Sequence, residues 1–143
     1  MQYTYDLNNI CNFNNILNND NSKEYLNNNK LISKIYSNNK RSYNIIKYDK
    51  NKLNVDEYNS IGKLRSLIFN NNKLICYSPS KAIDLNSFLQ NPELNKIEQC
   101  FAEEYIEGTM INVFYDDNIN EWNISTRSVI GANVSFFNKD ITF

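Results

Sequence analysis

The sequence contains no histidine, which excludes histidine-based acid–base catalysis and histidine metal ligands. It has only three cysteines, which are far apart and fit neither a zinc motif nor a disulfide framework. Each lies in an apolar run, so Cys11, Cys76 and Cys100 are predicted to be buried free thiols in a reducing compartment. Long apolar segments and a signal-like N-terminus are also lacking. We therefore expect a soluble, intracellular protein with no metal site and no membrane partner.

The sequence has no excess of either charge, because its 15 basic and 16 acidic residues give a formal net charge of −1. No global field draws such a chain to nucleic acid or membranes, although a local basic patch is compatible with it. About a fifth of the residues are asparagine, which indicates either a prion-like segment or codon drift in an AT-rich genome. Apolar residues recur between the asparagine clusters, which favours surface asparagine on a folded chain. A large DNA virus or an AT-rich protist would have this composition.

The first 40 residues are predicted to be helical and rich in asparagine. Apolar residues three and four positions apart form one stripe over 5–19 and another over 22–37. Asn21 or Ser22 would serve as the N-cap of the second helix. Asparagine is a poor helix former, so both helices would depend on tertiary packing.

Strand patterns replace helical ones from residue 43 onward. β-branched and aromatic runs, with turn residues between them, predict strands over 43–48, 64–69, 74–78, 109–115 and 121–126. The three asparagines in the segment 70–73 tolerate positive φ and predict a hairpin turn there. One or two helical turns are expected over 55–61, and Asp84 would cap a short helix over 85–89. This order predicts one α+β domain over 1–143, with helices in 1–40 followed by a mainly antiparallel sheet of hairpins in 43–143.

Two groups of polar residues could carry chemistry. Arg65 and Lys81 flank the first hairpin, so both cations would lie at one end of the sheet and could bind a polyphosphate. Ordinary solvated strand-end charges are the alternative. Glu107 and Gly108 begin the second hairpin and would face Arg127 near its end, framing a small ligand. The alternative there is a cross-strand ion pair of little energetic weight.

Four sequence signatures contain these residues: Leu64-Arg65-Ser66-Leu67-Ile68-Phe69, Ser78-Pro79-Ser80-Lys81, Tyr105-Ile106-Glu107-Gly108-Thr109-Met110-Ile111 and Trp122-Asn123-Ile124-Ser125-Thr126-Arg127-Ser128. In this order they resemble the N-terminal half of the phage-type RNA ligases. That family belongs to the covalent nucleotidyltransferases, with DNA ligases and mRNA capping enzymes. The resemblance covers roughly residues 43–130.

The resemblance implies a truncated nucleotidyltransferase domain, similar to ATP-grasp-like ligases, that takes ATP and Mg²⁺ and acts on RNA. Arg65 and Lys81 would contact the phosphates of the nucleotide. Glu107 and Gly108 would end the nucleotidylation motif, and Arg127 would support the nucleotide pocket.

Two departures from the family pattern bear on activity. The lysine that forms the lysyl–AMP bond is replaced by Tyr105, whose phenol has a reference pKa of about 10 and no evident activation. The later strands, which supply a metal-binding carboxylate and two lysines in the family, have no counterpart. The main hypothesis is therefore a catalytically impaired relative that retains a nucleotide-, phosphate- or RNA-binding surface. The alternatives are an active RNA ligase that uses Lys81, with a second chain completing the fold, and a non-enzymatic viral interaction or structural protein.

Overall fold

A computed structural model describes residues 22–38, 41–80, 82–90, 101–104 and 108–135, and the structural statements below concern these residues. Part of the sequence-based prediction lies outside the described residues, namely the helix over 5–19, Cys11, Lys81, Cys100, Tyr105 and Glu107.

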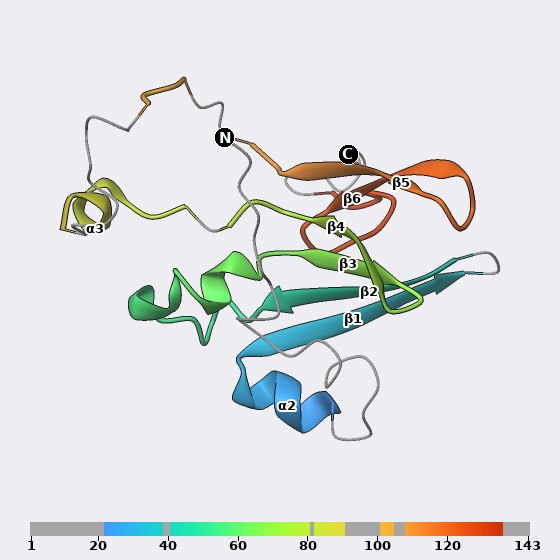
Figure 1. The fold of residues 1–143 in the computed structure, drawn as a ribbon, viewed down its shortest axis with the longest axis horizontal. Coiled ribbons are helices and arrows are strands. Elements are labelled where there is room, and N and C mark those ends of the chain that lie inside the picture. The colour runs from blue at the N-terminus through green and yellow to red at the C-terminus, as the bar shows by residue number, and fades with distance from the viewer. Residues whose placement is uncertain (1–21, 39–40, 81, 91–100, 105–107, 136–143) are drawn as a thin grey trace.

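Two antiparallel sheets form the framework (Figure 1). The larger has the order β1-β2-β3-β4, with β1 Leu31–Asn38, β2 Arg41–Tyr48, β3 Leu67–Asn70 and β4 Lys73–Tyr77. The smaller is a hairpin of β5 Ile111–Asp116 and β6 Glu121–Thr126. The remaining elements are α2 Ser22–Asn28, α3 Leu85–Gln90 and the 3₁₀ turns η2 Val55–Glu57 and η3 Ile61–Lys63. The predicted α+β class is confirmed, and no described helix has the length and apolar character needed to cross a membrane.

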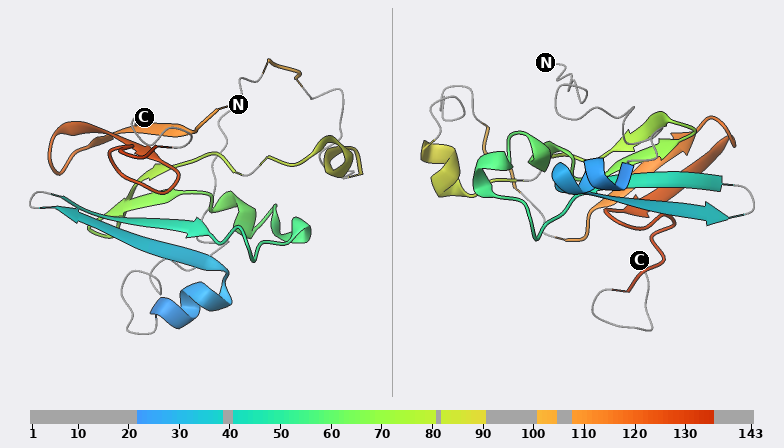
Figure 2. Two further views of the ribbon diagram at one scale, coloured as in Figure 1. Left: turned by 180° about the vertical axis from the view of Figure 1, so that it is seen from behind. Right: turned by 90° about the horizontal axis from the view of Figure 1, so that it is seen from below.

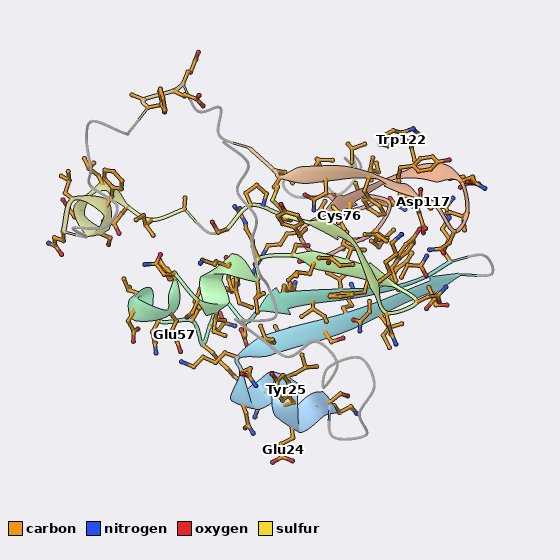
Figure 3. The ribbon with its side chains drawn as sticks, viewed as in Figure 1. Glu24, Tyr25, Glu57, Cys76, Asp117 and Trp122 are labelled. Atoms are coloured by element: carbon orange, nitrogen blue, oxygen red, sulfur yellow. The ribbon has the colours of Figure 1, made fainter. Side chains whose placement is uncertain are left out.

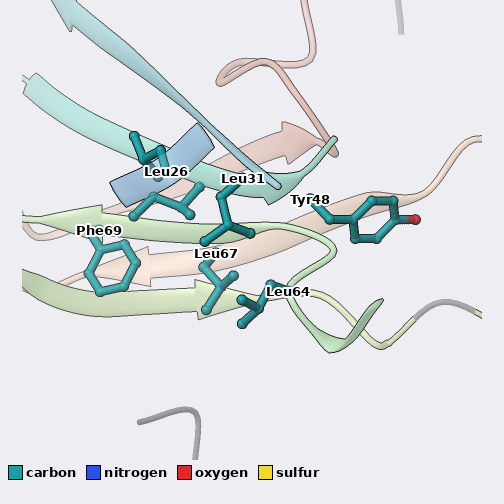
Figure 4. Packing of buried hydrophobic residues seen from close by; sticks show 7 residues of the cluster. Leu26, Leu31, Tyr48, Leu64, Leu67 and Phe69 are labelled. Carbon is teal, nitrogen blue, oxygen red and sulfur yellow. The ribbon is translucent and has the colours of Figure 1, made fainter. Parts of the chain in front are cut away.

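The elements are stacked in layers, since the β5–β6 hairpin and α2 lie on opposite sides of the four-stranded sheet (Figures 1 and 2). Strand β3 is internal, and all of its residues are buried. One apolar cluster lies on the α2 side of the sheet (Figure 4) and consists of Leu26, Leu31, Ile46, Tyr48, Leu64, Leu67 and Phe69. The other lies between the sheet and the hairpin and consists of Tyr43, Ile45, Ile68, Phe114 and Ile130.

The helix predicted over 22–37 is wrong beyond Asn28. Asn29 donates its side-chain amide to the Tyr25 carbonyl at 2.8 Å and so closes the last turn. Lys30 then adopts a φ of 56°, which no helix accommodates. From Leu31 the chain pairs with β2 along the whole of β1, since β-branched and aromatic residues suit a strand. The first 40 residues are therefore not uniformly helical.

The two predicted hairpins are confirmed, although both strand starts lie later than expected. The β3–β4 turn is tighter than predicted, because Asn70 pairs with Lys73 and only two residues form the loop. Asn71 and Asn72 have φ values of 47° and 64°, as a type I′ turn requires. A helical turn lies within the predicted range 55–61 as η2, while η3 begins at the end of that range and extends to Lys63. Asp84 caps α3 as predicted, by accepting the backbone N–H of Ser87 at 2.9 Å.

The β5–β6 hairpin presents its more polar face to the sheet. Its strands alternate, so that buried residues occupy one face and exposed residues the other. Phe114 is apolar, but the other buried residues of this inner face are Asn112, Asp116, Asn123 and Ser125. Hydrogen bonds therefore replace much of the apolar packing that usually joins two layers.

Candidate phosphate-binding site

Arg127 joins the hairpin to the sheet at the end away from the β5–β6 turn. Its Nε donates to the carbonyl of Arg65 at 3.3 Å, and its Nη2 donates to the carbonyl of Tyr48 at 3.1 Å. The guanidinium carbon also lies 4.4 Å from the centre of the Tyr48 ring, in a cation–π contact. The structure thus brings together Arg127 and the main chain of Arg65, two residues that the sequence predicted for one site.

Gly108 does not occupy the predicted position. The ladder pairs Ile111 with Thr126, so Gly108 lies before the first pair and is not opposite Arg127. An added Cβ at Gly108 would meet no atom within 4 Å, and the residue is exposed. The predicted pairing of Gly108 with Arg127 is therefore wrong, while the expected close approach of a ligand to Gly108 stays a prediction. The register differs from the expected one because Asp116 pairs with Glu121, which leaves a loop of residues 117–120 between the strands.

Lys47 belongs to the same group of residues, although the sequence analysis did not select it. Its Nζ donates to the Ser128 hydroxyl, directly after Arg127. Burial lowers the pKa of Lys47, and the positive charges of Arg127, Lys34 and Lys50 lower it further. We call Lys34, Lys47, Lys50 and Arg127 the cation cluster, and the main chain of Arg65 lies against its Arg127. Period-two alternation from Tyr43 could have revealed Lys47, since it places this lysine on a face that is otherwise covered.

The cation cluster extends across neighbouring strands. Lys34 pairs with Ile45 in the β1–β2 ladder, so its side chain is on the hairpin side of the sheet, as is that of Lys47. Lys34 and Lys50 are exposed, whereas Lys47, Arg65 and Arg127 are partly buried. Asp49 is the acidic neighbour that raises the pKa of Lys47. Positive charge is therefore locally concentrated on a chain whose net charge is −1.

Ser66 adds a buried hydroxyl next to Arg65 in the chain. Its residue is 1% exposed, and none of the described residues hydrogen-bonds to its Oγ. Such a group is uncommon inside proteins. The Ser66 carbonyl accepts the backbone N–H of Ser78 at 2.8 Å, which keeps the chain after β4 beside the segment before β3. The predicted meeting of the two hairpin ends is thus present as far as Ser78, while Lys81 lies beyond the described part.

A second polar centre surrounds Asp116 at the opposite end of the hairpin. Tyr43 Oη and Asn70 Nδ2 donate to its Oδ2 at 2.8 and 2.7 Å. The backbone and side-chain N–H groups of Asn118 donate to its Oδ1, each at 3.0 Å. Burial raises the pKa of Asp116, but these hydrogen bonds outweigh that effect and hold the pKa below its ordinary value. Every Asp116 oxygen is already occupied by donors, so this carboxylate is structural.

Arg41 closes the same end of the molecule. It donates Nη1 to Asn123 Oδ1 at 2.6 Å and forms an ion pair with Glu121 through Nη2. A polar cleft of about 350 Å³ lies beside it, lined by Ser37, Arg41, Ser42, Asn70, Asn71, Asn118 and Ile119.

Within the described part of the chain, no group of three or more acidic or cysteine residues could hold a metal ion. Cys76 is a half-buried free thiol, and its burial raises its pKa.

Comparisons of the chain with protein-family models, with curated proteins and with solved structures found no match. The RNA ligase resemblance therefore remains a prediction based on the four sequence signatures. Of the residues it selects, the Arg127 side chain contacts the main chain of Arg65, and Gly108 precedes the β5–β6 ladder. The cation cluster is accordingly the strongest candidate site.

Proposed function

We propose that this protein binds a phosphate-bearing ligand, a nucleotide or an RNA strand, on the cation cluster and does not transfer the nucleotide. The observation that supports the proposal is the gathering of Lys34, Lys50 and Arg127 around Lys47 on a chain of nearly balanced charge. Like charges at close range destabilise the free protein, and a polyanion would relieve their repulsion. Structural ion networks usually pair cations with carboxylates instead.

Each cation would have a distinct part in binding. Lys47 would act as a point charge toward a phosphate, held in place by Ser128. Arg127 already uses Nε and Nη2 for backbone carbonyls, so its Nη1 would face the ligand while the residue fixes the site's shape. Arg65 would supply a second guanidinium. Lys81, Glu107 and Gly108 remain part of the proposed site through the family resemblance.

Binding is tested by fluorescence anisotropy with a short labelled single-stranded RNA and by calorimetry with ATP, each at several salt concentrations. We expect Lys47→Met to weaken RNA binding about 5- to 10-fold and to reduce the salt slope by about 0.7, the value for one lost phosphate contact. The matched control is Lys73→Met, because Lys73 is 67% exposed and pairs with Asp117 near the β5–β6 turn. Equal binding by wild type and Lys47→Met would reject the proposal.

Loss of catalysis is tested separately. The protein is incubated with α-labelled ATP and Mg²⁺, and covalent label on the chain is measured. We expect no label, because Tyr105 occupies the position of the family's nucleophilic lysine. Label that disappears in Lys81→Ala would instead establish an active adenylyltransferase that uses ATP and Mg²⁺.

A further inference from the structure

The outer face of the β5–β6 hairpin is apolar and exposed. Strand alternation directs large apolar side chains away from the sheet, and Figure 3 shows Trp122 on this outer side. The exposed residues, with their exposed fractions, are Ile111 (40%), Val113 (62%), Tyr115 (42%), Trp122 (70%) and Ile124 (41%). We call these five residues the outer apolar face. A strand pair at the surface of an isolated domain usually turns its apolar face inward and its polar face to solvent. This hairpin does the opposite, since its inner face is the more polar one.

Cross-strand pairing makes this face continuous. Val113 pairs with Ile124, and Tyr115 pairs with Trp122, whose ring lies 5.4 Å from the tyrosine ring in an edge-to-face arrangement. The exposed fractions correspond to apolar surface on the order of 400 Å². This size is within the range of about 300–600 Å² for the largest apolar patch on a monomer, and such a patch is often functional.

The charges around the outer apolar face identify its partner. The face itself contains no ionisable group except the Tyr115 phenol. At the turn, Glu121 is paired with Arg41, and Asp117 is paired with Lys73. Among the residues that the structure describes, a nucleic acid would meet these acidic side chains, and no row of cations follows the aromatic rings along the hairpin. An identical copy would bring no unpaired like charges into opposition, which satisfies the central requirement of a two-fold interface.

We propose that the outer apolar face is a homodimer interface, in which two hairpins pack face to face around a two-fold axis. Homodimer interfaces are about 65% apolar, so 400 Å² of apolar area fits an interface of about 600 Å² on each copy. The total of about 1,200 Å² is at the lower limit for specific association, so the dimer is reversible, with a dissociation constant in the micromolar range. This inference does not depend on the phosphate-binding proposal, since the outer apolar face contains no member of the cation cluster and points away from the four-stranded sheet.

The test measures mass and tryptophan emission over a concentration series. Sedimentation velocity from about 1 to about 500 µM should show a monomer that converts to a dimer. Trp122 is the only tryptophan, so its emission should shift to the blue and its quenching by iodide should fall over the same range. Val113→Glu keeps this reporter and should weaken dimerisation at least about 30-fold, because a carboxylate would be buried without a partner. The matched control is Ile35→Glu on β1, which is 71% exposed and should dimerise like wild type.

Circular dichroism of both variants separates interface loss from unfolding. The substituted side chains are mostly exposed in the monomer, so both variants should retain the wild-type spectrum. A monomer at all concentrations, or a dimer that Val113→Glu leaves intact, would overturn the proposal. Dimerisation in which Trp122 remains fully accessible to iodide would also overturn it.

Discussion

Replacing Asp116 with asparagine should test the polar attachment of the hairpin most directly. Asp116 is fully buried and accepts four hydrogen bonds from Tyr43, Asn70 and Asn118. Asparagine preserves the shape of the side chain but turns one acceptor oxygen into a donor. Two of the four donors then face an NH₂ group. The Tyr43 hydroxyl can rotate to accept, whereas an amide or backbone N–H cannot do so without a change in structure.

The loss of stability follows from the unpaired groups. Each buried donor without an acceptor costs about 1–3 kcal/mol, and hydrogen bonds to charged groups are worth about 1.5–3 kcal/mol. With one or two donors unsatisfied, Asp116→Asn should lower the free energy of unfolding by about 2–4 kcal/mol. Single domains are stable by about 5–15 kcal/mol, so this change would remove a substantial part of the total. Tyr43→Phe removes one hydrogen bond and should cost about 1–2 kcal/mol.

Urea unfolding of wild type, the two single variants and the double variant forms the assay. Because the Tyr43 hydroxyl and the Asp116 carboxylate share a 2.8 Å hydrogen bond, the two changes should not be additive. The double-mutant cycle should give a coupling energy of about 1 kcal/mol or more. Additive effects, or a loss below about 0.5 kcal/mol in Asp116→Asn, would refute the assigned role.

Acid should reproduce the substitution in the wild-type protein. The pKa of Asp116 is lowered in the folded state, so its contribution to stability is present above the unfolded value of about 3.9. That contribution is lost as the pH falls through the lower, folded pKa. The stability difference between wild type and Asp116→Asn should therefore be full at pH 7 and shrink below about pH 4. A difference that does not change with pH would show that Asp116 is not the titrating group.

Four further substitutions, at three positions, have defined outcomes in urea unfolding. Leu67→Ala should lower stability by about 2–5 kcal/mol, because Leu67 is 1% exposed in the α2-side cluster; a loss below about 1 kcal/mol would contradict this packing. Asn71→Gly should be neutral, whereas Asn71→Val should cost about 1–2 kcal/mol because the residue has a φ of 47°; equal stability of the two would contradict the type I′ turn. Arg127→Lys should cost about 1–2 kcal/mol, since an ammonium lacks the separate Nε and Nη2 donors and the planar group that stacks on Tyr48; an unchanged midpoint would exclude a bridging role.

Local sequence patterns predicted the hairpins and the α3 cap because their determinants are short-range. Consecutive asparagines allow the positive φ values of the β3–β4 turn wherever it lies in the fold. The helix over 22–37 failed for the opposite reason. Tyr25, Leu26, Ile32, Ile35 and Tyr36 have helical spacing, yet pairing with β2 decides the structure after Lys30. The asparagines before Lys30 were the available signal for a helix end.

The candidate site could be predicted only in part, because its members meet through layer packing. Arg65 and Arg127 were selected by their positions at the hairpin ends and assigned to one pocket by the family resemblance, and the structure joins them through a backbone carbonyl. Lys47 lies in a strand whose sequence has the usual alternation of inward and outward residues. Ser128 reaches Lys47 only through the packing of the hairpin on the sheet. Asp116 was assigned to a loop, and period-two spacing from Phe114 was the signal that it points inward.

The separate attachment of the hairpin has a consequence for how the protein opens. Strands β5 and β6 share no ladder with β1–β4, and the two layers are joined in part by single side-chain bonds at Asp116, Arg41 and Lys47. Breaking those bonds would release the hairpin while the four-stranded sheet keeps its own ladder and its α2-side cluster. In native-state hydrogen exchange, amides of β5 and β6 should therefore exchange through a low-energy subglobal opening, and those of β2 and β3 only through global unfolding.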